Sequence, residues 1–545
     1  MSNYAKNLSK TSNRKVTPQL EVIPGRENDM AQNNAGGFSF VLNEWDYLDR
    51  FLILGTEGGT YYATETDLTK QNISNITNLL KKDGSRVVAR VVEISASGRA
   101  AKNDPALFVL ALAASSDDIE TRRAAFAALP KVARIGTHLF HFAMFVKGLR
   151  GWGRALRNAV GNWYLNKDAD DLAMQLVKYQ QRDGWSHRDL LRLAHPKAED
   201  EAINNMLRWT VKKGETDVSP ENMHRTIAAF ERAKVATSVK EIVALITDYN
   251  LPREAIPTKF LTEKAVWEAL LVKMPMTAMI RNLATMTRVG LIAPLSDASK
   301  TVRDRLLDEN VLRKSKIHPL NVLTAFYTYN AGRGIRGSNT WTPVGMVTDA
   351  LDEAFYLSFG NVESTGKNTL LALDVSGSMT CHNIMNIPNF TAREASAALA
   401  LVTMRVEPNV EIVGFTSDSG YYSGKSALTR LRISSNMRLD TVIKNISNLP
   451  FGGTDCSLPF TWATKNNVPV ENFAVYTDNE TYHGKIHPSQ ALAQYRNSSG
   501  IAAKSAVVAM AATPFTIADP KDGGMLDVVG FDSNTPQIIA DFFAK

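Results

Sequence analysis

TLLALDVSGSM, residues 369–379, begins the part of the chain in which strands alternate with helices. Its nearly continuous apolar run leads directly to an acidic residue, which is typical of a strand buried in a sheet. Four similar segments follow at 410–415, 472–478, 505–510 and 526–531. Helical patterns lie between and after them, at 393–406 and 535–545. This alternation predicts an open, mostly parallel, doubly wound α/β domain.

Oxygen-bearing side chains lie where several of these strands end. Ligands of open α/β sheets bind at the carboxyl ends of strands, and the candidate ligands there are Asp374, Ser376, Ser378, Thr454 and Asp478. An all-oxygen set with two carboxylates suits Mg²⁺ or a similar hard cation better than zinc. The pattern resembles the metal-ion-dependent adhesion site of von Willebrand A domains, which leaves one position open for an acidic group of a partner. The alternative is a site that only holds three loops together.

The preceding part of the chain, from about residue 38 to 360, is predicted to be helical almost throughout. Apolar residues recur there at intervals of three and four, most clearly at 107–114, 119–135, 137–149, 172–180 and 322–330. The breaks between these segments carry Pro, Gly or capping residues, as at Asp104-Pro105 and Asp183-Gly184. Helices of this length joined by short loops predict an α-solenoid of paired helices, although no strict sequence period is visible.

The predicted organisation therefore has three parts. Residues 1–37 are rich in Asn, Ser, Lys and Pro and poor in large apolar groups, which predicts a flexible tail. Residues 38–363 form the helical region, and residues 364–545 form the α/β domain. No apolar run is long enough to cross a membrane, and no secretory signal is recognisable, so we expect a cytoplasmic protein. The two cysteines are too few for a disulfide framework.

Positive charge is concentrated in the helical region. The net charge of the chain is +7, but residues 369–545 hold 13 Lys and Arg against 15 Asp and Glu, a net charge of −2. Residues 121–167, in contrast, contain no acid, and the basic residues among them are Arg122, Arg123, Lys131, Arg134, Lys147, Arg150, Arg154, Arg157 and Lys167. Such a stretch attracts polyanions. The alternative is an ordinary solvated helical face.

A series of motifs in the helical region identifies a family. In chain order they are Arg50-Phe51, GTEGGTYY (55–62), THLF (137–140), WGRALR (152–157), KYQQRDGWSHRDLLRLAH (178–195), GRGIRG (332–337) and ALDEAFY (350–356). Together with LALDVSGSM and GGTDCSLP, they make the chain from about residue 45 to 545 resemble the Ro family of TROVE-module proteins. This resemblance implies a toroid of HEAT-like helical repeats followed by the von Willebrand A-type domain.

The same resemblance implies an RNA-binding function. Proteins of the family bind small noncoding Y RNAs on the outer face of the ring, and the single-stranded 3′ ends of misfolded noncoding RNAs enter the central hole. Lys178, Arg182 and His195 match the outer RNA surface. Because Lys178 and Arg182 are four residues apart, we expect them to share one helical face. The full set of candidate RNA-binding residues is Lys178, Arg182, His195, Arg154, Arg157, Arg188 and Arg192.

Several of these residues have a second interpretation. His195 precedes Pro196, so it could simply end a helix, and Trp185 is either a stacking surface for a base or a core anchor. Residue 194 is Ala where the family usually has Ser. Three nearby acids, which could narrow the RNA footprint, are Asp168, Asp170 and Asp171.

The expected function is that of a non-enzymatic holder or sorter of small RNAs. GRGIRG follows a predicted helix rather than a strand, and GYYSGKS (420–426) lacks the spacing of a phosphate-binding loop. The metal site offers no evident general base, which disfavours a metal-dependent nuclease. Bacterial relatives imply a 3′-to-5′ exoribonuclease as partner, and we expect a monomer that binds neither DNA nor membranes. The competing hypothesis is a protein-adhesion module in which the metal binds an acidic protein.

Overall fold

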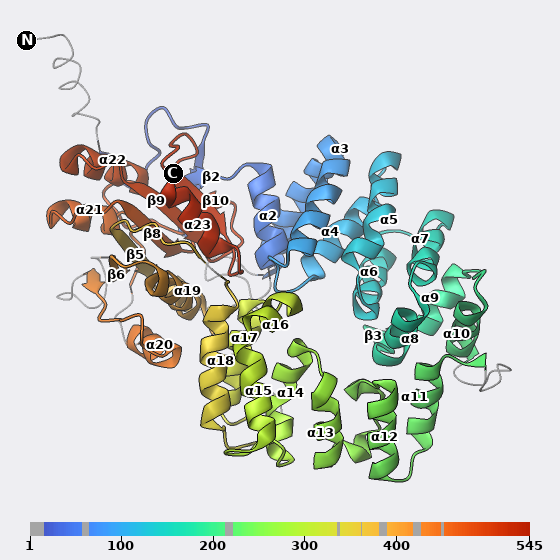
Figure 1. The fold of residues 1–545 in the computed structure, drawn as a ribbon. Helices are drawn as coiled ribbons and strands as arrows, with labels where there is room; N and C mark the ends of the chain where they lie inside the picture. Colours follow the sequence, from blue (N-terminus) through green and yellow to red (C-terminus); the bar gives the residue numbers. More distant parts are fainter. Residues whose placement is uncertain are drawn as a thin grey trace, which may run out of the picture. The chain divides into compact units, whose positions relative to one another are not determined.

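The computed structural model describes residues 16–56, 65–212, 222–334, 338–360, 362–380, 390–417, 427–447 and 452–545. The chain forms two compact units (Figure 1): Met1–Ile73 with Asn361–Lys545, here called the α/β unit, and Ser74–Gly360, here called the helical unit. The predicted boundary at residue 37 therefore differs from the structure, because the chain up to Ile73 belongs to the α/β unit. Cys381, the segment 420–426 and parts of GTEGGTYY and GRGIRG lie outside the described residues.

A six-stranded sheet organises the α/β unit, with strand order β11-β9-β8-β5-β6-β7. The strands are β5 (Thr369–Asp374), β6 (Val410–Phe415), β7 (Leu428–Arg430), β8 (Asn472–Thr477), β9 (Lys504–Ala509) and β11 (Met525–Val529). All neighbours are parallel except β7, which runs antiparallel to β6. The predicted strands and the mostly parallel sheet are confirmed. The short edge strand β7 was not predicted.

Helices cover both faces of this sheet, which is why its strands consist almost entirely of buried residues. One group packs together as α19 (Ala392–Val406), α20 (Leu439–Ser447) and α23 (Thr535–Ala544). The other consists of α21 (Leu458–Lys465) and α22 (Pro488–Ser499). Figure 1 shows α21 and α22 on the opposite side of the strands from α19 and α23. The doubly wound topology predicted from the sequence is confirmed.

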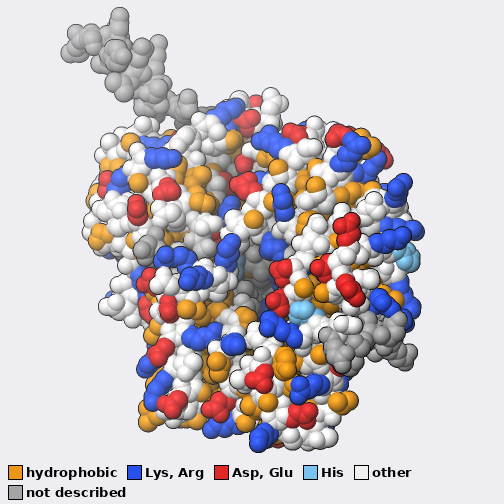
Figure 2. Space-filling model, turned by 45° about the vertical axis from the view of Figure 1, so that its right-hand side comes forward, with side chains coloured by type: hydrophobic (Ala, Val, Ile, Leu, Met, Phe, Trp, Pro, Cys, Tyr) orange, Lys and Arg blue, Asp and Glu red, His pale blue; other side chains and the backbone are white. Residues whose placement is uncertain are grey.

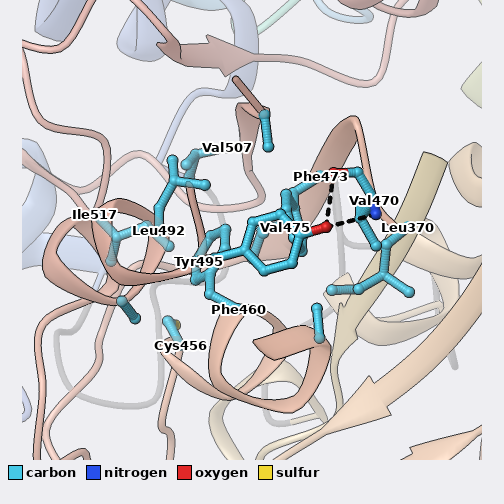
Figure 3. Close-up of a cluster of buried hydrophobic side chains, with 14 of the residues drawn as sticks. Leu370, Cys456, Phe460, Val470, Phe473, Val475, Leu492, Tyr495, Val507 and Ile517 are labelled. Atoms are coloured by element: carbon cyan, nitrogen blue, oxygen red, sulfur yellow. Dashed lines mark hydrogen bonds between the residues drawn. The ribbon is translucent and has the colours of Figure 1, made fainter. Parts of the chain in front are cut away.

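Tyr495 of α22 anchors the core on the α21–α22 side (Figure 3). Its ring lies edge-on to Phe473 of β8 with 5.2 Å between ring centroids. Its hydroxyl donates to the carbonyl of Val468 at 2.7 Å and accepts the N–H of Val470 at 2.6 Å. A buried phenol is thus satisfied by the backbone that leads into β8, which fixes that strand against the helix. Cys456 is a free, buried thiol in the same core.

The prediction of a flexible tail is wrong for residues 16–37. This segment contains β1 (Met30–Gln32), which pairs antiparallel with β2 (Phe38–Val41), and β2 in turn pairs with β10 (Phe515–Thr516). Gln19 is fully buried, although the segment contains few large apolar residues. Its order comes from polar side chains that bond to residues more than 400 positions away, a contact that composition cannot reveal.

Arg26 gives one example of these long-range contacts. Both of its terminal nitrogens donate to Asp519 at 2.6 Å, and its Nε donates to Asp29. Its guanidinium also lies over the ring of Phe40 in β2. A two-pronged contact of this kind is stronger and more directional than a single exposed ion pair.

The helical unit is a succession of short helices, as predicted. Its helices are α3 (Glu65–Ser97, which begins in the α/β unit), α4 (Asp104–Ala114), α5 (Ile119–Val132), α6 (Gly136–Leu149), α7 (Arg154–Leu165), α8 (Ala169–Lys178), α9 (His187–Ala194), α10 (Glu201–Lys212), α11 (Arg225–Val235), α12 (Val239–Tyr249), α13 (Lys264–Lys273), α14 (Met276–Arg288), α15 (Asp297–Leu307), α16 (Glu309–Ser315), α17 (Pro319–Asn330) and α18 (Gly345–Leu357). No described helix is both long and apolar enough to cross a membrane.

Each of these helices packs mainly on helices close to it in sequence, as in an α-solenoid. One contact joins residues far apart within the unit. The ring of His318, which caps the start of α17, lies 3.2 Å from the carbonyl oxygen of Arg99, in the loop between α3 and α4. His318 is buried, and burial lowers its pKa to about 4, so the ring is neutral at pH 7. A late helix of the solenoid is thereby tied to its beginning.

Arg50 holds the N-terminal part of the α/β unit to the sheet. It lies in α2 (Glu44–Leu54) and is fully buried. Its guanidinium donates to the carbonyls of Thr513 and Phe515 at 2.8 and 2.7 Å and to Asp527 of β11 at 2.6 Å. One side chain thus satisfies two backbone acceptors and one carboxylate.

Replacing Arg50 should be strongly destabilising. Arg50→Met removes the donor to the carbonyls of Thr513 and Phe515 and leaves Asp527 with only the Thr516 hydroxyl among its described donors, so we expect the free energy of unfolding to fall by about 3 kcal/mol or more. Chemical denaturation of the full chain measures this change. The control is Lys521→Met, because Lys521 forms a solvent-exposed ion pair with Asp29 and should contribute less than about 1 kcal/mol. Equal effects of the two substitutions would contradict the role assigned to Arg50.

Candidate metal site and nucleic-acid interface

The candidate metal site lies where the strand order of the sheet reverses. From β5 the chain moves outward to β6 and then returns to β8 on the other side of β5. The loops that follow β5 and β8 diverge at such a switch point and leave a crevice at the carboxyl ends of the strands. Asp374 is the last residue of β5, and Asp478 comes directly after β8. The topology therefore places the two predicted carboxylates at the same edge of the sheet.

Hydrogen bonds fix the first loop of this site. The Asp374 carboxylate accepts the N–H of Ser376 at 2.9 Å and the hydroxyl of Thr477 at 2.8 Å. The hydroxyls of Ser376 and Ser378 lie 3.1 Å apart. All three members of the D-x-S-x-S motif are buried. Their side-chain oxygens converge as the spacing predicted.

The second and third loops are joined to the first through their backbones. The carbonyl of Gly452 accepts the N–H of Gly377, and the carbonyl of Thr454 accepts the N–H groups of Tyr482 and His483. A Cβ at Gly453 would lie 1.9 Å from the ring of His483, an exposed side chain, so that ring would have to move to admit any larger residue. Backbone hydrogen bonds therefore connect all three loops of the candidate site.

The chemistry of these side chains fits a divalent cation. Burial raises the pKa of the Asp374 carboxyl, and the negative charge of Asp478 raises it further. Burial likewise raises the pKa of nearby Glu480 to about 8. The Thr454 hydroxyl is buried and makes no hydrogen bond with any described residue. Two buried carboxylates and an unpaired hydroxyl are costly unless a cation compensates for them.

Glu480 is a further feature of this site that the motif did not reveal. It is fully buried two residues after Asp478, and its carboxylate accepts hydrogen bonds from the side chain of Asn34 at 2.7 Å and the backbone of Ala35. No group of three or more His, Cys, Asp or Glu within the described ranges is arranged to hold a metal. The candidate site therefore depends on hydroxyl oxygens as well as carboxylates.

Five of the candidate RNA-binding residues lie on α7, on α9 or directly after α9, two helices that pack against each other. They are Arg154 and Arg157 of α7, Arg188 and Arg192 of α9, and His195. Arg154, Arg157 and Arg192 are exposed, and Arg188 is half-buried. Figure 2 shows Lys and Arg side chains gathered along the right-hand edge of the displayed face. The structure thus brings cations from separate sequence motifs onto adjacent helices.

The expectation that Lys178 and Arg182 share one helical face is wrong. Helix α8 ends at Lys178, and Arg182 lies in β3 (Gln181–Arg182), which pairs with β4 (Trp185–Ser186). Asp183 and Gly184 connect these strands, and both have positive φ, at 52° and 76°. An Asp-Gly pair favours a two-residue hairpin of this kind. The break expected at Asp183-Gly184 is present, but α8 already ends at Lys178, before Arg182.

The hairpin that carries Arg182 is fixed by His141 of α6, which the sequence analysis did not single out. Its ring forms ion pairs with Asp104 of α4 and with Asp183 in the hairpin turn. The hydrogen bond with Asp104 raises the pKa of His141, and the negative charges of Asp104 and Asp183 raise it further. The His141 ring therefore links α4, α6 and the turn next to Arg182.

The structure also separates the alternatives for His195 and Trp185. His195 ends α9 in the left-handed conformation with φ 48°, and its backbone N–H donates to Leu191. It is exposed, and its ring forms no hydrogen bond with any described residue. Trp185 is half-buried and packs on Trp152 with 5.6 Å between ring centroids. His195 is thus both a helix end and an accessible side chain, while Trp185 is a packing residue at the surface.

The acids that precede Lys178 are engaged in local structure. Asp168 caps the start of α8, Asp171 pairs with Lys167 at 2.8 Å, and Asp170 lies 3.2 Å from Arg225. Lys178 is at the opposite end of α8, which places it about 15 Å from Asp168 at the helical rise per residue. The negative charges therefore lie away from this candidate cation.

A buried histidine supports the helix that carries Arg188, Arg192 and His195. His187 begins α9, its Nδ1 accepts the hydroxyl of Tyr164 at 2.9 Å, and its ring packs on Phe140. Burial lowers the pKa of His187 to about 4 from an ordinary 6.5. The unfolded chain therefore binds the proton more readily than the folded one between these two values.

We expect the protein to lose stability as the pH falls from 6.5 toward 4, with His187 contributing on the order of 2 kcal/mol. His187→Gln should reduce this pH dependence, because the substituted residue does not titrate. Thermal unfolding midpoints of both proteins across this interval measure the difference. A variant whose midpoint falls as steeply as that of the parent would contradict the assignment.

The fold defines a class: a helical-repeat protein with exposed cations on adjacent helices, in one chain with an A-type α/β unit that gathers buried carboxylates and hydroxyls at the ends of β5 and β8. The chain matches the TROVE domain over residues 31–328 and the Ro60 vWA domain over residues 368–543. It is 41 % identical over 539 residues to the RNA-binding protein RO60 of Deinococcus radiodurans, covering 98 % of this chain and 99 % of that protein.

Two further comparisons agree. The chain is 37 % identical over 606 residues to the RNA-binding protein RO60 of Caenorhabditis elegans, covering 97 % of this chain and 92 % of the relative. The crystal structure of the Deinococcus radiodurans Ro (RSR) protein matches with a TM-score of 0.69 at 41 % identity, covering 92 % of this chain and 99 % of that structure. The chain therefore belongs to the Ro60 family.

Proposed function

We propose that this protein binds structured small RNAs through the cations of α7, α8, α9 and the β3–β4 hairpin. The observation that carries the proposal is the set of exposed, unpaired cations on adjacent helices. Arg154, Arg157 and Arg192 form no ion pair with any described residue. Arginine and lysine in such an arrangement bind phosphates and release counterions. Two relatives of similar length that are named RNA-binding proteins support the same function.

The finer proposal concerns which RNAs bind and where. A Y-like RNA is proposed to bind at the outer cations, including Lys178, Arg182 and His195. The single-stranded 3′ end of a misfolded RNA is proposed to enter the opening of the helical ring. The contact between His318 and Arg99 supports this idea, because it ties a late helix of the unit to its beginning. The protein would present such RNAs to a 3′-to-5′ exoribonuclease without catalysing cleavage itself.

Removing two of the proposed contacts should weaken RNA binding. Lys178→Ala combined with Arg182→Ala should lower the affinity for a folded Y-like RNA, and each lost phosphate contact should reduce the salt slope by about one unit. Gel-shift titrations over a range of salt concentrations measure both quantities. The control is Lys300→Ala with Arg303→Ala on α15, because it removes the same two charges from exposed positions outside the candidate RNA-binding residues. Arg182 and the two control residues each contact an acid, so pairing alone does not distinguish the two double variants.

If the control pair lowers the affinity for the Y-like RNA as much as Lys178→Ala with Arg182→Ala does, the proposed outer RNA-binding surface is wrong.

The same titrations with one structured RNA, its 3′ tail either free or paired to a complement, test the proposed binding of the tail in the opening of the ring. A duplex is too wide for an opening that admits a flexible strand. Equal affinity for the two forms would count against threading. Affinity that does not change with salt would count against phosphate binding altogether.

We further propose that Asp374, Ser376, Ser378, Thr454 and Asp478 bind one divalent cation of the Mg²⁺ type. The support is the buried pair of carboxylates, whose repulsion a cation would relieve. Such a cation supplies an electrophilic centre that attracts an acidic group of a partner. The competing function, a protein-adhesion module, would use this site alone.

Asp374→Ala should abolish the stabilisation by Mg²⁺ and leave RNA affinity close to that of the parent. A ligand at about one hundred times its Kd stabilises the folded state by about 2.7 kcal/mol, so Mg²⁺ should raise the thermal midpoint of the parent only. The control is Asp541→Asn, an exposed acid on α23. Loss of RNA binding together with metal binding would show that the two sites are not independent. A parent midpoint that does not respond to divalent cations would overturn the metal proposal.

A further inference from the structure

The helical unit contains a cavity of about 260 Å³ that none of the sequence motifs defined. Its lining comes from α8, α12, α13 and α14 and from the turn η2 (Arg253–Ala255). The segments that build it are separated by up to about one hundred residues, so only the stacking of the helices forms it. Lys178, a candidate RNA-binding residue, lines one side.

The floor of the cavity is apolar. Ile246, Leu270 and Met274 line it and are at most 5 % exposed. Met174 and Pro252 add half-buried apolar surface. Ligand sites typically combine such apolar walls with a few polar groups that orient the ligand. The walls suit a planar ring, which can contact apolar side chains with both faces.

Two amide side chains supply hydrogen-bonding groups at the cavity. Asn282 of α14 uses its Nδ2 to donate to the carbonyl of Ala278, which leaves its Oδ1 as an acceptor. Asn250 ends α12 in the left-handed conformation with φ 54° and is exposed. Amides of this kind can pair with the edge of a nucleobase, which carries both donors and acceptors.

Cations dominate the remaining polar lining. Lys178, Arg253 and Lys273 contribute three positive charges, and Glu254 is the one carboxylate among the lining residues. None of the three cations forms an ion pair with a residue in the described ranges, although Lys178 lies over the ring of Tyr179. A net positive charge beside an apolar cavity favours a ligand that joins a flat ring to a phosphate.

We propose that this cavity holds one unstacked base of a bound RNA strand. The base would lie among Ile246, Leu270 and Met274 and bond to Asn282, while Lys178 and Lys273 contact the flanking phosphates. Proteins that read single-stranded RNA commonly use pockets for bases that are splayed out of the stack. The inference rests on the proposed function, and Lys178 would connect the outer cations to the cavity.

Photocrosslinking and pocket filling test this proposal. The probe is a single-stranded oligonucleotide containing 4-thiouridine, crosslinked to the full-length protein and mapped by mass spectrometry. We expect crosslinked peptides from α12–α14. Ala278→Phe, which fills the half-buried edge of the cavity, should weaken binding of the oligonucleotide roughly tenfold, the usual cost of losing one stacked base. Binding of the same sequence as a duplex should change little, because its bases stay stacked.

Charge is tested separately with a matched pair on α13. Lys273→Gln should weaken binding of the single strand, whereas Lys264→Gln, at an exposed position outside the cavity, should not. Ala269→Leu serves as a second, smaller filling variant if Ala278→Phe lowers the thermal midpoint. If the parent binds RNA but its crosslinks map elsewhere and neither filling variant lowers affinity, the cavity proposal is wrong and the proposed function stands. If the parent binds no RNA, both are overturned.

Discussion

The guanidinium of Arg50 joins the beginning of the chain to its end. It bonds to two carbonyls of the segment before β11 and to a carboxylate of β11 itself. Around it, β2 pairs with β10, and Arg26 bonds to Asp519. The α/β unit is consequently built from both ends of the sequence, and the helical unit is inserted between them. Both ends of the helical unit therefore continue along the chain into the same folded unit.

The separation of charge between the two units matches the separation of their proposed roles. The α/β unit collects buried acids at the ends of β5 and β8, where repulsion between carboxylates raises the pKa of Asp374. The helical unit presents exposed cations on α7 and α9 and keeps its acids in caps and ion pairs, as Asp168 and Asp171 show. One unit thus favours a small cation and the other favours a polyanion.

The segment after Asp478 joins the metal site to the N-terminal part of the chain. Gln19 contacts Thr481, Gly484 and Ile486 through its side chain. Asn34 and Ala35 bond to the buried carboxylate of Glu480. The loop that carries the last candidate ligand is therefore held by residues from the other end of the chain. A motif search limited to the A-type domain misses this support, because the contact spans more than 400 positions.

Some features could be predicted from the sequence because they depend on neighbouring residues. The apolar runs located β5, β6, β8, β9 and β11, and the D-x-S-x-S spacing located buried oxygen-bearing side chains at the end of β5, since strand ends meet at one edge of a parallel sheet. Helical periodicity located most of the helices of the solenoid, because it depends on residues only three or four positions apart. The Asp183-Gly184 break was also predicted locally, but α8 ends before it, so the four-residue spacing of Lys178 and Arg182 does not place them on one helical face.

Only the tertiary structure decided the order of residues 16–37 and the cavity beside Lys178. Few large apolar side chains mark that N-terminal segment, because its stability comes from hydrogen bonds with residues near the C-terminus. Lys178, Arg253 and Lys273 are scattered along the sequence, and stacking of α8 on the segments around η2 and α13 brings them to one cavity. A sequence pattern records which residues are neighbours along the chain. Which charged side chains lie close together in space depends on how distant helices pack, and this packing is determined by the whole fold.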